Sequence, residues 1–275
     1  MMDVRHTQDI LFADLPTKME KSRSVIDEAF SRFAPDELAV AVTGGKDSTL
    51  LLRLILDASQ KAGRARPVIV HLDEGDPFPE ITAFLARLCR EWDLSLEVVR
   101  NEDLLGPGRT VGEWIEVSGL SEKNRRELSR LSFSGRGFAF DPESPAGNHL
   151  CKTVPLQEFL DRRGIAALVT AIRWDEHEAR FSEDYFSQRS VPPHLRVHPL
   201  LHFRERDIWE ATFFLGLPFC ELYRLGYRSL GTRSGTVRAS DLPAWEQDLE
   251  HTPERAGRAT EKERSMAALR SLGYL

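Results

Sequence analysis

The sequence predicts an α/β fold, a doubly wound and mostly parallel five-stranded sheet with helices on both faces and a C-terminal extension. Short apolar runs at 37–42, 67–75 and 95–101 alternate with segments of helical periodicity. Strand, helix and strand in this order form right-handed βαβ units, which build parallel sheets. Two more strands are predicted at 165–174 and 194–200. The expected strand order is 3-2-1-4-5.

The helices are predicted from apolar residues at helical spacing. One helix at 17–33 precedes the sheet. The segment "DSTLLLRLILDASQKAG" follows the first strand and closes at Gly63, as glycine commonly ends a helix. Further helices are expected at "PEITAFLARLCREWD", 153–164 and 205–217.

The segments between and after these elements define the domain organisation. Residues 103–150 are rich in Gly, Ser, Pro and Arg, and we expect a long functional loop with one short helix near "SEKNRRELSRL". The chain is therefore divided into a helical segment at 1–36, an α/β domain at 37–217 that contains this insertion, and a tail at 218–275. The tail is expected to end in a charged helix, "PERAGRATEKERSMAALRSLGYL".

The turn "TGGKDST" at 43–49 joins the first strand to its helix. Backbone N–H groups at a helix N-terminus attract anions, and glycine lets a ligand approach the backbone. Lys46 adds a positive charge. The alternative is a tight connection that Asp47 or Ser48 merely caps. The spacing differs from GxxxxGK[ST], yet the composition favours a phosphate loop. The residues predicted to bind the phosphates are Thr43, Gly44, Gly45, Ser48 and Thr49, with Lys46 and Asp47 as catalytic residues.

A second polar segment, "AIRWDEHEAR" at 171–180, ends the fourth predicted strand. Ligands of doubly wound sheets bind beyond the carboxyl ends of the strands where the strand order reverses, here between the first and fourth strands. Arg173 and Arg180 suit an anion with several oxygens, and we predict catalytic roles for both. Asp175 and Glu176 would orient them or share a magnesium ion. The alternative is a solvated loop with internal ion pairs.

Two more segments are expected near this edge. In "HLDEGDPFPEI" at 71–81, Asp73 would accept a hydrogen bond from a ribose or hold magnesium, and Gly75 would clear space for the nucleotide. In the tail, Arg228 and Arg233 would complete the anion site.

Composition excludes several classes of protein. The formal charge of −6 argues against non-specific electrostatic binding to nucleic acid or to an anionic membrane. No segment reaches the ~20 apolar residues of a membrane span, and no signal peptide is recognisable. The three cysteines, without a CxxC pair, give no disulfide framework or zinc site and suit a reducing cytosol, so we expect a cytoplasmic protein. His194, His198 and His202 are spaced by four residues, as metal ligands on one helix face could be. Pro199 lies between the last two, which disfavours a helix and therefore a metal site there.

Several motifs resemble one known family. "TGGKDS" resembles the PP-loop SGGxDS of the ATP pyrophosphatases, with Thr43 for the first serine. Similar to the PAPS reductase family within that group are "DEGDPFPE", "CKTVPLQEFL", "AIRWDEHEAR" and "RVHPLLHFRERDIW". The resemblance covers residues 38–275 except the insertion. It implies that the loop holds the phosphates of ATP and that chemistry occurs at the α-phosphate, with pyrophosphate as the leaving group.

Within that family, reductases need a nucleophilic thiolate near the C-terminus, whereas no cysteine follows Cys220. Two segments of the tail, "GYRSLGTRSGTV" and residues 252–275, are similar to the small subunit of bacterial sulfate adenylyltransferase. This resemblance implies adenylyl transfer from ATP to sulfate, with Mg²⁺ and a GTPase partner subunit. The alternatives are sulfur insertion or adenylation of another acceptor, a reductase-like protein without its cysteine, and a non-catalytic nucleotide-binding subunit; homo-oligomers are compatible with each.

Overall fold

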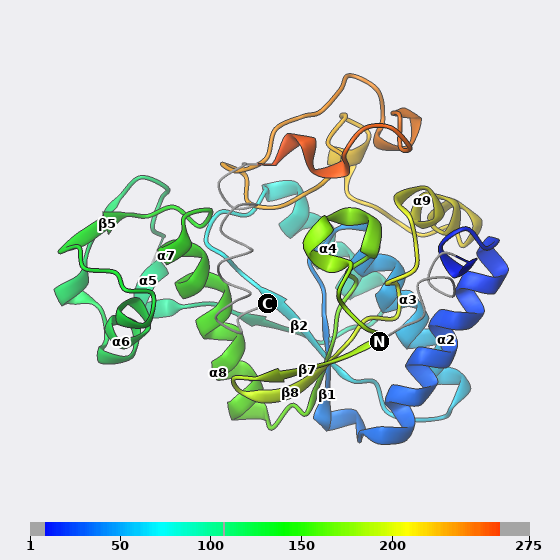
Figure 1. Cartoon of the computed structure of the whole chain (residues 1–275), viewed down its shortest axis with the longest axis horizontal. Coiled ribbons are helices and arrows are strands. Elements are labelled where there is room, and N and C mark those ends of the chain that lie inside the picture. Colours follow the sequence, from blue (N-terminus) through cyan, green and yellow to red (C-terminus); the bar gives the residue numbers. More distant parts are fainter. Residues whose placement is uncertain (1–8, 107, 259–275) are drawn as a thin grey trace.

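The computed structural model describes residues 9–106 and 108–258, and its centre is a six-stranded sheet in the order β3-β2-β1-β6-β8-β7 (Figure 1). Five strands are parallel and confirm the predicted order, while β7 pairs antiparallel with β8. The strands are β1 (Leu38–Ala41), β2 (Val68–Leu72), β3 (Leu96–Val99), β6 (Ala167–Val169), β7 (Phe186–Ser190) and β8 (Pro193–Val197).

The prediction of five strands is therefore wrong by one edge strand. The sequence of β7, "FSQRS", has no apolar run, and none of its residues is buried. An edge strand packs against only one neighbour and need not bury both faces, so it lacks the hydrophobic signal of a central parallel strand.

Helices cover both faces of the sheet, as predicted. Leu38 and Val40 of β1 belong to a large core cluster shared with four helices, whereas Ala39 between them packs with Phe159 and Leu160 on the opposite face. This alternation follows from the two-residue period of a strand. The helices of the large cluster are α2 (Leu15–Arg32), α3 (Lys46–Lys61), α4 (Pro79–Glu91) and α9 (Glu205–Phe214); α8 (Val154–Arg163) covers the other face.

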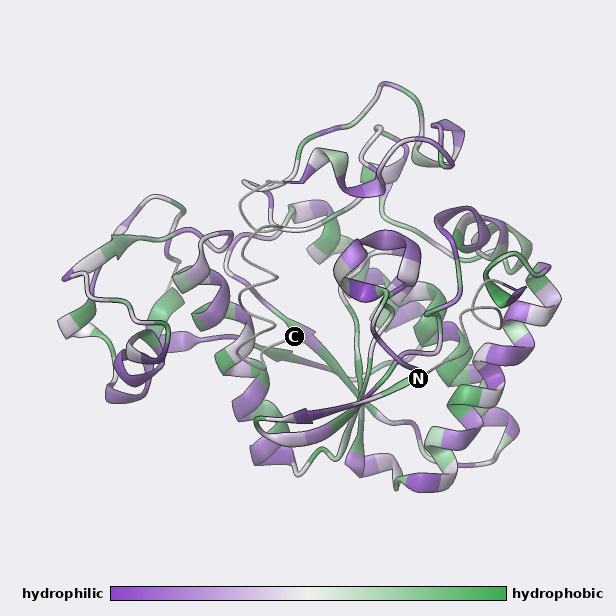
Figure 2. Cartoon of the chain, viewed as in Figure 1, coloured by the Kyte–Doolittle hydropathy of each residue, from purple (hydrophilic) through white to green (hydrophobic). Residues whose placement is uncertain are grey.

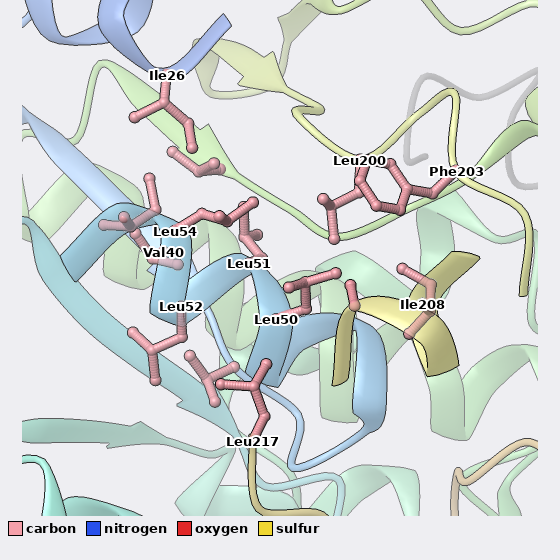
Figure 3. Packing of buried hydrophobic residues seen from close by; sticks show 14 of the residues in the cluster. Ile26, Val40, Leu50, Leu51, Leu52, Leu54, Leu200, Phe203, Ile208 and Leu217 are labelled. Atoms are coloured by element: carbon pink, nitrogen blue, oxygen red, sulfur yellow. The ribbon is translucent and has the colours of Figure 1, made fainter. Parts of the chain in front are cut away.

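The large core is centred on α3. Leu50, Leu51 and Leu54 of this helix pack among residues of β1, α2 and α9 (Figure 3). Ile26 of α2 lies in the same cluster, so the segment at 1–36 contributes to the core of the domain that follows it. Hydrophobic residues concentrate in the central strands and on the inner sides of the helices, and hydrophilic residues on the outer sides (Figure 2). None of the described helices has the length and apolar character that crossing a membrane requires.

The insertion is a small folded unit, so the prediction of a long loop is wrong, although its predicted helix is present. Leu104, Ile115, Phe138 and Phe140 form a separate hydrophobic cluster there. Strands of three residues and helices of four are too short to show periodicity in a sequence. Its elements are α5 (Glu102–Leu105), β4 (Trp114–Glu116), α6 (Glu122–Arg130), β5 (Gly137–Ala139) and α7 (Pro145–Asn148), followed by a π-helical turn at His149–Thr153 that leads into α8.

The C-terminal segment follows a different pattern. From the end of α9 to residue 258 it contains only short 3-10 turns, η6 (Glu221–Tyr223), η7 (Ala244–Glu246) and η8 (Glu254–Gly257). It is drawn in orange across the upper part of Figure 1. The predicted charged helix begins with the turn η8, and its remainder from residue 259 lies outside the described residues.

Candidate active site

The turn after β1 depends on two glycines. Gly44 has φ +77°, and a Cβ there would lie 3.0 Å from Cγ2 of Ile81. Gly45 is the N-cap of α3, and a Cβ there would lie 3.3 Å from the hydroxyl of Tyr223. Both positions therefore place the backbone against neighbouring side chains more closely than a larger residue would allow.

The hydroxyl groups of this turn hold its shape. Ser48 Oγ donates to Gly45 O at 3.0 Å and accepts from Thr43 N at 3.2 Å. Thr43 Oγ1 accepts from Gly45 N at 3.3 Å, and Thr49 Oγ1 donates to Gly45 O at 3.0 Å. In this arrangement the hydroxyls bond to the turn itself, and their binding to phosphate stays a prediction.

Lys46 is a buried cation. Its Nζ lies 2.5 Å from Glu254 Oε1, 3.3 Å from Arg228 O and 3.7 Å from Glu205 Oε1. Its backbone N–H donates to the hydroxyl of Tyr223 at 3.0 Å. Burial alone would lower the pKa of Lys46, but the carboxylates of Glu254 and Glu205 raise it above its usual value, so the ammonium remains charged.

Arg173 joins the second loop to the first. Its side chain is fully buried, and its Nε donates to Asp175 Oδ1 at 2.9 Å. Its guanidinium also pairs with Asp47 of the glycine turn and with Glu254. Burial alone would lower the pKa of Arg173, but Asp175 and Glu254 raise it. The two loops therefore meet at the carboxyl edge of β1 and β6, as the topology predicted.

The two carboxylates predicted to hold magnesium are engaged by N–H donors. Asp175 Oδ2 accepts from Glu205 N at 2.8 Å at the start of α9, and Glu176 pairs with Arg180 at 2.7 Å and with Arg255 at 3.0 Å. Burial would raise the pKa of Glu176, but Arg180 and Arg255 lower it to about 2.

A preformed magnesium site needs carboxylate oxygens directed at the ion. Each oxygen of Asp175 and Glu176 faces a donor instead, and the described residues contain no group of three His, Cys, Asp or Glu side chains able to hold a metal. This arrangement does not fit bound magnesium. It fits the other role predicted for both residues, the orientation of guanidinium groups.

The segment after β2 faces the insertion. Asp73 accepts from Gly75 N at 2.9 Å and from Arg100 Nη1 at 3.1 Å. A Cβ at Gly75, which has φ +86°, would lie 2.3 Å from Leu105 Cδ2. The positive φ and the close packing against the insertion both favour glycine here, and the predicted contacts of Asp73 and Gly75 with a nucleotide stay untested.

The two tail arginines lie in different surroundings. Arg228 is buried, and its Nε donates to Glu205 Oε2 at 2.8 Å, within the cluster that surrounds Lys46. Arg233 is exposed, and its backbone N–H donates to Asp76 O at 2.8 Å. The structure thus brings Arg228 to the site through its carboxylate partner and leaves the side chain of Arg233 on the surface.

Three residues at the site were absent from the sequence prediction: Glu205, Tyr223 and Glu254. Burial and the neighbouring Glu254 raise the pKa of Glu205 to about 7. Burial likewise raises the pKa of Tyr223 to about 12. Glu254 lies 208 positions from Lys46, so no local pattern reveals the contact. The only available signal was the position of Glu254 in the charged "ERAGR" run of the tail.

Comparisons with known proteins identify the family of the chain. The model of the phosphoadenosine phosphosulfate reductase domain family matches residues 37–238. A probable FAD synthase of Caenorhabditis briggsae is 26% identical over 227 residues, which cover 82% of this chain and 35% of that protein. Sulfate adenylyltransferase subunit 2 of Azospirillum brasilense is 26% identical over 253 residues, which cover 82% of this chain and 72% of that subunit. The chain thus spans about a third of the length of the nematode protein.

Among solved structures, the chain is similar to the FMN adenylyltransferase of Candida glabrata in complex with FMN and the ATP analog AMPCPP. The TM-score is 0.61 at 20% sequence identity, with 94% of this chain and 79% of that chain covered. This likeness supports the fold over nearly the whole chain.

Proposed function

Because this chain belongs to the phosphoadenosine phosphosulfate reductase domain family, we propose that it acts on the α-phosphate of ATP and transfers the adenylyl group to an oxyanion. One observation carries the proposal. Lys46 and Arg173, two buried cations from loops far apart in the sequence, both bind the carboxylate of Glu254 at the carboxyl edge of the sheet. A place where two buried cations share one carboxylate is suited to phosphate oxygens.

The proposed reaction is a displacement at phosphorus. An oxygen of the acceptor forms a bond to the α-phosphorus, the bond from that phosphorus to the bridging oxygen breaks, and pyrophosphate leaves. Lys46 and Arg173 would neutralise the charge that develops on the departing phosphates, and Arg173 would also hold the acceptor. Such reactions depend on positioning and charge stabilisation, and no covalent intermediate with the protein is required. ATP would enter as its magnesium complex, since Mg²⁺ commonly binds substrate phosphates.

Sulfate is the proposed acceptor. The relative from Azospirillum brasilense carries the name sulfate adenylyltransferase subunit 2, and the similarity covers most of both chains. The tail segments "GYRSLG" and "ERAGR" resemble the same subunit. Under this proposal a GTPase subunit is the partner of the chain.

A phosphomonoester such as FMN is the second candidate acceptor. The relative from Caenorhabditis briggsae, at the same identity, is called a probable FAD synthase. Phosphate and sulfate are both tetrahedral oxyanions, so Arg173 would accommodate either group.

A reductase reaction through a cysteine has less support. Cys151 and Cys220 are buried, and burial raises the pKa of the Cys220 thiol. A nucleophilic cysteine needs a lowered pKa and access to its substrate.

The direct test is product analysis with labelled ATP, Mg²⁺ and inorganic pyrophosphatase, in the presence of sulfate, FMN or neither. Each reaction is run with and without a GTPase subunit, and Lys46→Gln is the inactive control. We expect adenylyl sulfate from sulfate. FAD formed from FMN alone would instead support the second acceptor. ATP binding without any exchange of labelled pyrophosphate would support a non-catalytic subunit.

A further inference from the structure

Glu254 occupies the centre of the candidate active site. Its side chain is 7% exposed, its Oε1 lies 2.5 Å from Lys46 Nζ, and its Oε2 pairs with Arg173. Lys46 is the first residue of α3 and Arg173 lies in the loop after β6, whereas Glu254 comes from the turn η8 in the C-terminal segment. The position therefore holds an anion that another part of the chain supplies.

The segment at 252–258, which we call the strap, is attached by polar contacts. Thr252 lies 2.5 Å from Arg228 Nη1, Arg255 pairs with Glu176 at 3.0 Å, and Gly257 O accepts from Val237 N at 2.9 Å. None of its residues belongs to the hydrophobic clusters found among the described residues. Ion pairs can be exchanged for a competing anion, whereas moving a packed apolar element exposes its surface to water.

We infer that the strap is an intramolecular competitor of the substrate. The carboxylate of Glu254 takes the place of a phosphate group of ATP or pyrophosphate, and the strap leaves Lys46 and Arg173 when that anion binds. This inference rests on the proposed function, because it assumes that these two cations bind phosphate. A carboxylate carries one negative charge, while pyrophosphate carries several and offers more oxygens, so pyrophosphate can replace Glu254 at the same two cations.

The opposite role would be that of a positioning residue, in which Glu254 stays in place and keeps Lys46 oriented for the phosphate. The two roles predict opposite changes when the charge of Glu254 is removed. A competitor weakens phosphate binding, so its loss strengthens binding. A positioning residue supports phosphate binding, so its loss weakens binding.

The experiment is calorimetric titration of the full chain with inorganic pyrophosphate, for wild type and Glu254→Gln. We expect Glu254→Gln to lower the Kd for pyrophosphate at least tenfold. The matched control is Glu250→Gln, because Glu250 is a carboxylate of the C-terminal segment outside the strap and pairs with Arg206 at 3.0 Å. The Kd of Glu250→Gln for pyrophosphate should stay within about twofold of the wild-type value. An unchanged or raised Kd in Glu254→Gln would overturn the inference.

Hydrogen–deuterium exchange on the wild-type chain tests the same inference if Glu254→Gln folds poorly. Pyrophosphate should increase exchange at 252–258 and leave exchange in α3 unchanged or lower; equal or increased protection of 252–258 would contradict displacement. Lys46→Gln separates the two proposals. If pyrophosphate binding depends on Lys46 but the strap does not respond, only the strap inference fails. If pyrophosphate binds neither wild type nor Glu254→Gln, the proposed function fails with it.

Discussion

The candidate active site has two halves that are built in different ways. The sheet half, residues 43–49 and 171–180, lies at the ends of β1 and β6 and at the start of α3. The C-terminal half, residues 221–258, supplies its groups from turns of three or four residues. Strand pairing and the buried leucines of α3 determine the position of the first half. The position of the second half depends largely on side-chain contacts.

This difference separates two kinds of residue within one charge cluster. Lys46 is the first residue of α3 and Arg173 lies in the loop after β6, fully buried, so both should keep their positions when the ligand changes. Glu254 depends on the cations it binds, so it should respond to a competing anion. The comparison teaches that the sheet half can position the cations of an anion site while a carboxylate from a less firmly packed segment occupies it.

The largest expected effect is on catalysis through the sheet half. Lys46→Gln should reduce ATP–pyrophosphate exchange by about 100-fold or more, because it removes the charge that would stabilise the leaving phosphates. Lys123→Gln, which alters an exposed lysine of the insertion that pairs with Glu158, should leave the rate within about twofold of wild type. Exchange assays with circular dichroism as the folding check measure this. An undiminished rate in Lys46→Gln would remove Lys46 from the reaction.

The next effect concerns the contact of the sheet with the insertion. Gly75→Ala should lower the free energy of unfolding by roughly 2–4 kcal/mol, since the new Cβ would meet Leu105 at a positive φ. Gly63→Ala is the control: it also has a positive φ, but no atom lies within 4 Å of its Cβ, so about 1–2 kcal/mol is expected. Urea unfolding measures both. Equal losses would mean that packing against the insertion adds nothing at Gly75.

A smaller effect is expected from the hydroxyl that joins the two halves. Tyr223→Phe removes the acceptor of the buried Lys46 N–H and should cost about 1–3 kcal/mol of unfolding free energy. Tyr185→Phe is the matched control, because the Tyr185 hydroxyl has no hydrogen-bond partner among the described residues, and its loss should stay within about 0.5 kcal/mol. Thermal and urea unfolding of both variants measure this. Similar losses of unfolding free energy in the two variants would mean that the Tyr223 contact does not stabilise the fold.

The smallest effect, taken per pH unit, is the pH dependence of stability that arises from two buried histidines after β8. Burial lowers the pKa of His198 and of His202 to about 4, while the unfolded chain titrates near 6.5. Between these values the unfolded state binds more protons, so stability should fall as pH decreases from 6.5 toward 4, by at most about 1.4 kcal/mol per pH unit for each histidine. Urea unfolding of His202→Gln at pH 7 and pH 5 should show a shallower slope than wild type. A slope in His202→Gln equal to that of wild type would contradict this prediction.

Much of the sheet half could be predicted from the sequence. The apolar runs at 37–42 and 165–174 and the glycine turn are local patterns, and parallel topology brings the ends of those strands to one edge. The contact of Arg173 with Asp47 agrees with that expectation. The strand β7 and the elements of the insertion other than α6 were missed because they are too short or too polar to carry a periodic signal.

By itself, the sequence determined the order of the five parallel strands and the meeting of the two polar loops, since hydrophobic periodicity and handedness are properties of neighbouring residues. Only the tertiary structure decided the rest. It placed Tyr223 on the backbone of Lys46, closed the space above Gly75 with Leu105, and set Glu254 between the two cations. Such contacts join residues far apart along the chain. Because burying a charge is costly unless it is paired, the folded structure decides which charged residues can lie together in the buried site.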